Sequence, residues 1–456
     1  MYSQNECIHR PDNFRPVCCC LKYLLSILFR HQFTCNTMSN IPRDQNFDSS
    51  FALLYDGYTF IQERCRRFNS DIFLTRIMGE VAVCISGAEA ARQFYDTHKF
   101  RREDAIPSRI KKTLFGDGGV QTLDGEDHRY RKEMFMSLMT PQSIRMFMDT
   151  LSRKWENCIS RWEMTERVVL FDEVQELLCR AACDWTGVPL TDDEAGEKAK
   201  DLWAMVDAFG AIGPRHWRGR RARKRTGQWI GEFIKKVRWG ELEIAKDAPA
   251  YIIARHRQRN ERLLPGTVAA VELINLIRPI VAISTYIVFS ALALHRYPEY
   301  RNRLLNHTDD FTDLFIQEVR RYFPFAPFLG ARVHSPFSWR GYNFDTGRLV
   351  LLDVYGTNHD PKLWKDPDTF NPERFREWEG SLYSFIPQGG NNHDEGHRCA
   401  GEWITIETMK VALDFLTRYM EYDVPGQDLD FSLSRMPTYP RSGFIISGVR
   451  SRVHEK

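Results

Sequence analysis

A single cysteine in a short glycine-containing stretch carries the strongest chemical signal in this sequence. Cys399 lies in Gly-His-Arg-Cys-Ala-Gly at 396–401, and apolar residues at helical spacing predict a helix directly after it, over 403–416. A thiol at a helix start lies near the positive end of the helix dipole and near free N–H groups, and both favour the thiolate. The glycines let the backbone approach a large flat group closely. The stretch therefore predicts a thiolate that ligates a metal.

A second group of residues is expected to support this loop. Glu318 and Arg321 are three residues apart in a predicted helix, so they share one face. Arg374 follows in a Pro-Glu-Arg-Phe segment. A carboxylate shared by two guanidinium groups forms strong, often bidentate hydrogen bonds. We expect this structural cluster to lock the loop that carries Cys399, and an isolated surface salt bridge between Glu318 and Arg321 is the alternative.

Together, the three motifs resemble a haem-thiolate cytochrome P-450, over residues from about 41 to 450. The resemblance implies haem b (iron protoporphyrin IX) as cofactor, with Cys399 as the axial thiolate of the iron. The loop before the cysteine departs from the usual pattern. In place of the usual Phe, Gly and Arg, it has Asn392, Glu395 and His397. Because Gly389 and Gly390 lie further upstream, we expect the spacing between the glycines and the cysteine to differ from that of the usual loop.

The long helix predicted over 268–295 contains an unusual pair, Arg278-Pro279. This place resembles the position at which oxygen-activating members of the superfamily have an acidic residue followed by threonine. That pair relays protons, and neither residue is present here. Proline lacks an N–H and clashes with the carbonyl of Asn275, so the helix should kink. A permanent cation in an apolar helix is costly unless it is paired. We expect Arg278 to pair with a substrate carboxylate, and an internal carboxylate or a haem propionate is the alternative partner.

These features resemble the fatty-acid peroxygenase branch of the cytochromes P-450. Supporting segments are 388–390, 121–125 with His128, 209–217 and 355–361. The resemblance implies that hydrogen peroxide, without a reductase, drives hydroxylation of long-chain fatty acids at the alpha or beta carbon. The substrate carboxylate on Arg278 would act as general acid and base, and the thiolate would favour cleavage of the O–O bond.

The same resemblance implies roles for further residues. Gln121 is expected in the distal pocket beside Arg278 and Pro279, where glutamine favours hydroxylation over decarboxylation. His128, Lys132 and His397 are expected to bind the haem propionates. The wall of the alkyl-chain channel is expected to contain Leu114, Phe115, Val206, Phe209 and Phe325. The alternatives are solvated positions for the polar residues and ordinary core positions for the apolar ones.

Two other functions remain open from the sequence. One is a reductase-dependent monooxygenase, which needs a proton relay that Arg278-Pro279 does not provide. The other is a non-catalytic haem protein that binds fatty acids, which the residue pattern alone does not separate from an enzyme.

The elements that must position these residues are mostly helices. Helical periodicity is present over 49–69, 87–96, 139–160, 172–185, 193–209, 226–238, 268–295 and 309–322. Alternating patterns predict strands in 71–85 and short strands between 328 and 353. We expect a mainly α fold with small β-sheets, the cytochrome P-450 fold, with haem between the long central helix and the cysteine loop.

Composition limits the remaining possibilities. The 456 residues are 43% hydrophobic and contain no linker or repeat, which predicts one domain over 38–456. A net charge of +3 is too small to indicate a nucleic-acid partner. Eleven cysteines without a secreted-type framework indicate reduced thiols in an intracellular, cytoplasmic protein. Cys179 and Cys183, four residues apart, are expected to be buried structural thiols rather than half of a metal site.

Two segments have several interpretations. Residues 1–37 contain an apolar-leaning run over 17–29 that is too short to span a bilayer. They are interpreted as a disordered extension, a weak membrane anchor, or an upstream start wrongly included before Met38.

The basic run over 215–225 is expected to be a solvated loop. The alternatives for this run are attraction of anionic substrates, attraction of a membrane surface, and nuclear targeting.

Overall fold

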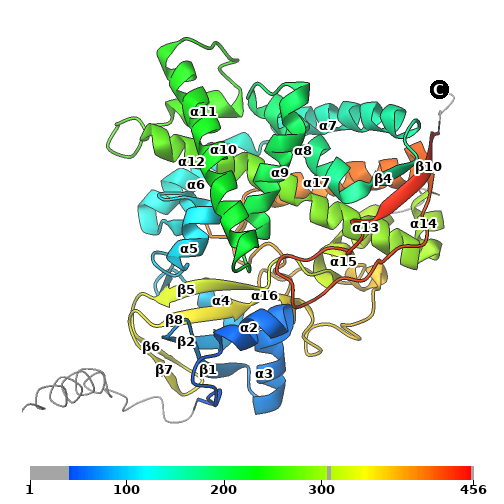
Figure 1. Ribbon diagram of the computed structural model, residues 1–456. Helices are drawn as coiled ribbons and strands as arrows, with labels where there is room; N and C mark the ends of the chain where they lie inside the picture. Colours follow the sequence, from blue (N-terminus) through cyan, green and yellow to red (C-terminus); the bar gives the residue numbers. More distant parts are fainter. Residues whose placement is uncertain (1–40, 306–309, 453–456) are drawn as a thin grey trace, which may run out of the picture.

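Helices make up most of the part of the chain that the structure, a computed structural model, describes, namely residues 41–305 and 310–452 (Figure 1). The predicted fold class, mainly α with small sheets, is confirmed. The extension predicted over 1–37 lies outside the described residues, and the single-domain boundary at 38 stays a prediction.

The helices follow the apolar periodicity of the sequence, with ends shifted by a few residues from the predicted ones. The α-helices are α2 (Ser50–Asp56), α3 (Phe60–Phe68), α4 (Ala88–Phe94), α5 (Ser108–Ile110), α6 (Gly125–Leu138), α7 (Pro141–Trp162), α8 (Leu170–Thr186), α9 (Asp192–Asp207), α10 (Pro214–Trp239), α11 (Pro249–Arg255), α12 (Gly266–Ala282), α13 (Ser284–Arg296), α14 (Pro298–Leu305), α15 (Phe311–Tyr322), α16 (Val354–Asn358) and α17 (Glu402–Asp414). Short 3-10 or π turns are η1 (Gly57–Thr59), η2 (Lys111–Phe115), η3 (Val120–Thr122), η4 (Pro372–Phe375) and η5 (Phe415–Tyr419).

The largest sheet joins strands from both halves of the chain. Its order is β1 (Ile72–Ile77), β2 (Glu80–Ile85), β8 (Leu349–Asp353), β5 (Phe328–Val333) and β3 (Phe100–Arg101). The pair β2 and β8 is parallel, with Ala82 opposite Leu349, and the other pairs are antiparallel. Figure 1 shows this sheet below the helical part of the molecule. The strands predicted in 71–85 and 328–353 are therefore present.

Two smaller sheets complete the strand set of the described residues. One is three-stranded, in the order β4 (Arg167–Val169), β10 (Ile445–Ser451) and β9 (Met420–Asp423). The other is the hairpin of β6 (Phe337–Trp339) and β7 (Tyr342–Phe344). The first of these sheets joins the C-terminal strand to the segment before α8, and so ties the end of the chain to the helical core.

Helices α12 and α13 form the centre of the core. The stretch Gly266–Arg296 is long and apolar enough to cross a membrane by composition, but 94% of its most apolar window is buried inside the protein. Helices α8, α15 and α17 pack against it, so its apolar character belongs to a core helix. Pro279 lies inside α12, and the α-helix is interrupted four residues later, at Ile283. This is where the structure breaks the single helix expected over 268–295.

One expectation about the basic run is wrong. Residues 215–225 are not a loop but the first half of α10, which begins with proline at its first position. Arg215 and Arg225 pair with Asp207 and Asp201 of α9. Since arginine is a good helix former and these pairs join two adjacent helices, the charge density of the run does not prevent helix formation.

Candidate active site

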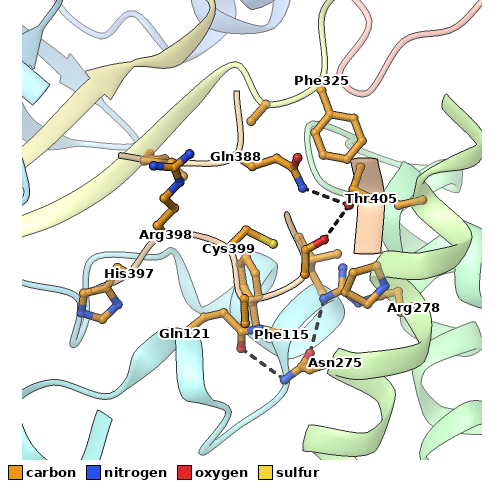
Figure 2. A pocket seen from close by; sticks show the side chains of 18 of the residues that line it. Phe115, Gln121, Asn275, Arg278, Phe325, Gln388, His397, Arg398, Cys399 and Thr405 are labelled. Carbon is orange, nitrogen blue, oxygen red and sulfur yellow. Dashed lines mark hydrogen bonds between the residues drawn. The ribbon is translucent and has the colours of Figure 1, made fainter. Parts of the chain in front are cut away.

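A cavity of about 380 Å³ lies between α12 and the loop that precedes α17, and we call it the Cys399 cavity (Figure 2). It brings together every residue that the sequence assigned to cofactor or substrate. Those residues are Leu114, Phe115, Gln121, His128, Lys132, Val206, Phe209, Arg278, Pro279, Phe325, His397 and Cys399. No aspartate or glutamate lines it among the residues that the structure describes.

Cys399 is held in place by backbone bonds on both sides. Its N–H donates to the carbonyl of Gln388 at 3.0 Å, and its carbonyl accepts from the N–H of Glu402 at 3.3 Å. The thiol receives hydrogen bonds from the Gly401 N–H and the Gln388 side chain. Burial nevertheless raises the pKa of Cys399 above its ordinary value, and the lowering by Gly401, Lys132 and Gln388 is smaller. The helix start alone therefore does not produce the expected thiolate, which needs a cation beside the sulfur.

The residues around Cys399 fit a haem better than a bare metal ion. No group of three or more His, Cys, Asp or Glu side chains able to hold a metal exists in the described part of the chain. A metal bound to Cys399 must therefore bring most of its ligands with it, as iron in a porphyrin does. Iron would supply the positive charge that the buried thiolate lacks.

Two histidines in close ring contact and a lysine lie at one edge of the cavity. The rings of His128 and His397 are 3.8 Å apart between centroids, and His397 Nε2 is 3.5 Å from Asp124 Oδ1. Burial lowers the pKa of His128 to about 3 and that of His397 to about 4. The Lys132 ammonium donates to the Arg398 carbonyl. These hydrogen-bond donors on one edge are suited to the propionates of a haem.

Arg278 is buried without an acidic partner. Only 6% of the residue is exposed, and its Nη2 donates to Asn275 Oδ1 at 3.3 Å. Its Nε is buried and has no hydrogen-bond partner. Burial, reinforced by the charge of Arg223, lowers the pKa of Arg278 to about 9. No internal carboxylate pairs with it among the described residues, so that alternative finds no support and the cation is left for a ligand.

Asn275 is the residue in this cavity that sequence reasoning missed as a functional group. Its Nδ2 donates to Gln121 Oε1 and to Glu272 Oε2, both at 3.2 Å, while its Oδ1 accepts from Arg278. Figure 2 shows the row from Gln121 through Asn275 to Arg278. Glu272, which is fully buried, is held in turn by Arg131 at 2.5 Å. The spacing of three residues from Asn275 to Arg278 on one helix face was the available signal.

The opposite part of the wall is apolar. Phe115 ends η2, Val206 lies in the last turn of α9, and Phe209 follows that helix. Phe325 stacks on Tyr286 of α13 at 4.5 Å between ring centroids. The guanidinium carbon of Arg278 lies 5.9 Å from the Phe115 ring centroid. Lys132 and Arg398 lie at the edge with the two histidines, so Arg278 is the cation next to this apolar surface. That arrangement suits an amphiphile with one anionic end.

The predicted cluster of Glu318, Arg321 and Arg374 is formed. Glu318 receives two bonds from Arg321 at 2.8 Å, and its shortest contact with Arg374 is 3.1 Å. Arg321 also donates to the carbonyls of Asn358 and Pro367, both at 2.9 Å. The Asn358 side chain accepts from the Ile386 N–H at 3.0 Å, just before the cysteine loop. The cluster thus connects to that loop through Asn358.

A second buried network ties the same helix to the cysteine helix, and sequence reasoning missed it. Arg320 pairs with Glu402, the first residue of α17, and Arg398 also bonds Glu402, at 2.5 and 3.0 Å. Arg320 and Arg398 lower the pKa of Glu402 to about 2, although burial opposes them. Because residues 320 and 402 are far apart in sequence, no local spacing could indicate this contact.

Comparisons with known proteins agree with this geometry. The family model described as Cytochrome P450 matches residues 310–443. A solved variant of cytochrome P450SP alpha is 46% identical, covers 89% of this chain and all of its own, and has a TM-score of 0.87. Cytochrome P450EX alpha with myristic acid is 43% identical over 90% of this chain and 99% of its own, with a TM-score of 0.88. A variant of the cytochrome OleT in complex with arachidonic acid is 34% identical over 92% of this chain and all of its own, with a TM-score of 0.89.

Proposed function

This chain belongs to the cytochrome P-450 family, on its fatty-acid peroxygenase branch, and we propose that it uses hydrogen peroxide to hydroxylate long-chain fatty acids at the alpha or beta carbon. The solved relatives hold myristic acid in one case and arachidonic acid in another. The cofactor in this proposal is haem b, with the Cys399 thiolate as its axial ligand.

The observation that carries the proposal is the buried, unpaired Arg278 in the Cys399 cavity. A buried cation without a counterion is unfavourable, and a bound carboxylate would relieve that cost. An arginine guanidinium binds carboxylates with two parallel hydrogen bonds, which fixes their orientation as well as their position. The apolar wall that contains Phe115, Val206 and Phe209 would then hold the alkyl chain.

The chain's own residues supply binding and orientation rather than proton transfer. The haem, when bound, supplies the iron at which peroxide is cleaved, and thiolate ligation favours that cleavage. Arg278 holds the substrate carboxylate beside the reaction site, and Asn275 fixes both Arg278 and Gln121. Because the carboxylate is anchored, the alpha and beta carbons have the least conformational freedom of the substrate's alkyl chain. Positioning therefore sets the regiochemistry.

The missing acid and base must come from outside the described protein residues. Cleavage of peroxide needs a group that takes a proton from one oxygen and returns it to the departing oxygen. No carboxylate lines the described cavity, and burial lowers the pKa of Arg278 only to about 9, so the arginine remains a cation at neutral pH. The substrate carboxylate held by Arg278 is the group available for both transfers.

Product analysis tests this function directly. Purified holoenzyme is incubated with one long-chain fatty acid and either hydrogen peroxide alone or NAD(P)H with a redox-partner reductase. We expect 2- or 3-hydroxy acids by mass spectrometry with peroxide alone. Product only with NAD(P)H and reductase would indicate a monooxygenase, and a spectral change on fatty-acid binding without product would indicate a binding protein.

A further inference from the structure

A second cavity, of about 670 Å³, lies between α10 and the beginning of α12, and no residue lines both it and the Cys399 cavity. One side is formed by α10 and the other by α12, and residues just after η2 close one end. The lining residues are Lys112, Gly116, Asp117, Arg223, Gly227, Gly231, Lys235, Gly266, Thr267, Ala270, Val271 and Ile274. The proposed function uses none of them.

Small residues keep this cavity open. Gly227 and Gly231 lie one turn apart on α10, and a Cβ at either position would meet no atom within 4 Å. Gly266 and Ala270 lie across from them on α12. Glycine is a poor helix former because of its backbone freedom. Two glycines facing a void in one helix therefore indicate space for a ligand, since alanine would fit sterically and form a better helix.

The cavity has more cationic than acidic side chains, and one guanidinium nitrogen of its arginine has no hydrogen-bond partner. Lys112, Arg223 and Lys235 line it against one acid, Asp117. Arg223 Nη1 is buried and has no hydrogen-bond partner. The Arg223 guanidinium lies at the wall of the cavity, where a Cβ on Gly116 would collide with it. Lys235 has only a loose contact, 3.6 Å, with Glu232, which does not line the cavity.

The beginning of α12 adds to this charge distribution. Its N-terminal residues Gly266 and Thr267 line the cavity, and no side chain caps the helix. The first N–H groups of a helix of this length carry partial positive charge and favour an anion. They act here together with the three cationic side chains, so donors reach the cavity from α10, from α12 and from Lys112 of η2.

We propose that this second cavity binds a phosphate monoester, with Arg223 as its principal ligand. The lining has two more cationic than acidic side chains, and a phosphate monoester carries about −1.5 to −2 charge at pH 7 with three acceptor oxygens. A fatty-acid carboxylate fits less well, because only Val271 and Ile274 offer branched alkyl surface for its chain. The phosphate can belong to a soluble monoester or to an anionic phospholipid headgroup.

Calorimetric titration of the holoenzyme with glycerol 3-phosphate tests the proposal, in phosphate-free buffer at constant ionic strength. Arg223→Gln should raise the dissociation constant by about tenfold or more, the usual effect of losing a hydrogen bond to a charged group. Arg221→Gln is the matched control, since this exposed residue lies on the same helix outside the cavity, and it should leave the constant unchanged. Gly231→Leu fills the cavity and should abolish binding without removing a charge.

A vesicle arm identifies the source of the phosphate. Co-sedimentation with vesicles of phosphatidic acid in phosphatidylcholine, sensitive to Arg223→Gln but not to Arg221→Gln, would assign the site to a lipid headgroup. Binding of glycerol 3-phosphate with the same sensitivity, and no vesicle binding, would assign it to a soluble monoester. The proposal is overturned if neither probe binds, if Arg221→Gln and Arg223→Gln weaken binding equally, or if hexanoate displaces the phosphate. None of these readouts depends on peroxide-driven turnover, so the proposed function can fail independently.

Discussion

Two regions of this protein bury arginines, and they treat the charge in opposite ways. Next to the cysteine loop, Arg321 is fully buried and bonds Glu318 and backbone carbonyls, and Arg320 is paired with Glu402. In the Cys399 cavity, Arg278 has a neutral amide as neighbour and no acidic partner among the described residues.

The difference separates a structural role from a binding role. A buried charge whose partners are complete fixes geometry, and removing one partner leaves the other uncompensated. A buried charge without a partner costs stability until a ligand arrives. The paired arginines therefore position the cysteine loop, whereas Arg278 is reserved for an anion.

Removing a paired arginine next to the cysteine loop should have the largest effect on stability. Arg321→Leu leaves Glu318 buried without its main partner, so the free energy of unfolding should fall by roughly 3–5 kcal/mol. Urea unfolding measures the change. Arg92→Leu is a control, because its pair with Glu89 is exposed and should contribute about 0–1 kcal/mol. Equal effects of the two substitutions would contradict the structural role of the cluster.

Removing the arginine of the Cys399 cavity should leave stability intact and weaken fatty-acid binding. Arg278→Leu deletes an uncompensated buried charge, so the free energy of unfolding should stay unchanged or rise. Fatty-acid binding should weaken by roughly 2–5 kcal/mol, as for the loss of one partner of a buried charge pair. Spectral titration of the holoenzyme gives the affinity. If Arg278→Leu destabilises the fold as much as Arg321→Leu, the contrast between the regions is wrong.

Asn275 offers a way to convert one type of site into the other. Asn275→Leu removes the bonds to Gln121, Glu272 and Arg278, and kcat/KM should fall by about tenfold or more, because the bond from Arg278 is made by a charged group. Asn275→Asp has nearly the same shape and also loses the bonds that Asn275 Nδ2 donates to Gln121 and Glu272, but unlike leucine it gives Arg278 an internal carboxylate. Its fatty-acid affinity should therefore fall further than that of Asn275→Leu. The reverse order would show that Arg278 does not bind the substrate through its charge.

A change of pH near neutrality should have the smallest effect on fatty-acid binding. Burial and Arg223 lower the pKa of Arg278 to about 9 in the free protein. As the pH rises through that value, the arginine loses its charge and the ion pair with the carboxylate is lost. Affinity should be constant near neutral pH and fall above about pH 9, by up to tenfold per unit. Titration over this range checks the sign, and affinity that rises with pH would contradict it.

The sequence predicted the parts of the site that depend on local spacing. Cys399 at a helix start, the face shared by Glu318 and Arg321, and Arg278-Pro279 in an apolar helix all lie within single elements. Their environment was less predictable. The helix start suggested a thiolate, but burial raises the pKa of Cys399, and burial is set by residues from distant segments.

Contacts between distant segments account for what was missed. The network of Arg320, Glu402 and Arg398 joins two helices through residues that follow no local pattern. The basic run over 215–225 was expected to be a loop because its charge density suggested solvation. It is helical because α9 supplies carboxylates for Arg215 and Arg225.

The most direct test of the central claim uses a substrate that has no carboxylate. Peroxide-driven oxidation of such a substrate is measured with and without a short carboxylic acid, in the wild type and in Arg278→Leu. If the carboxylate held by Arg278 is the acid and base, the wild type turns over only when the short acid is present, and the variant turns over in neither case. Equal turnover of the wild type without the acid, or of the variant with it, would contradict the claim.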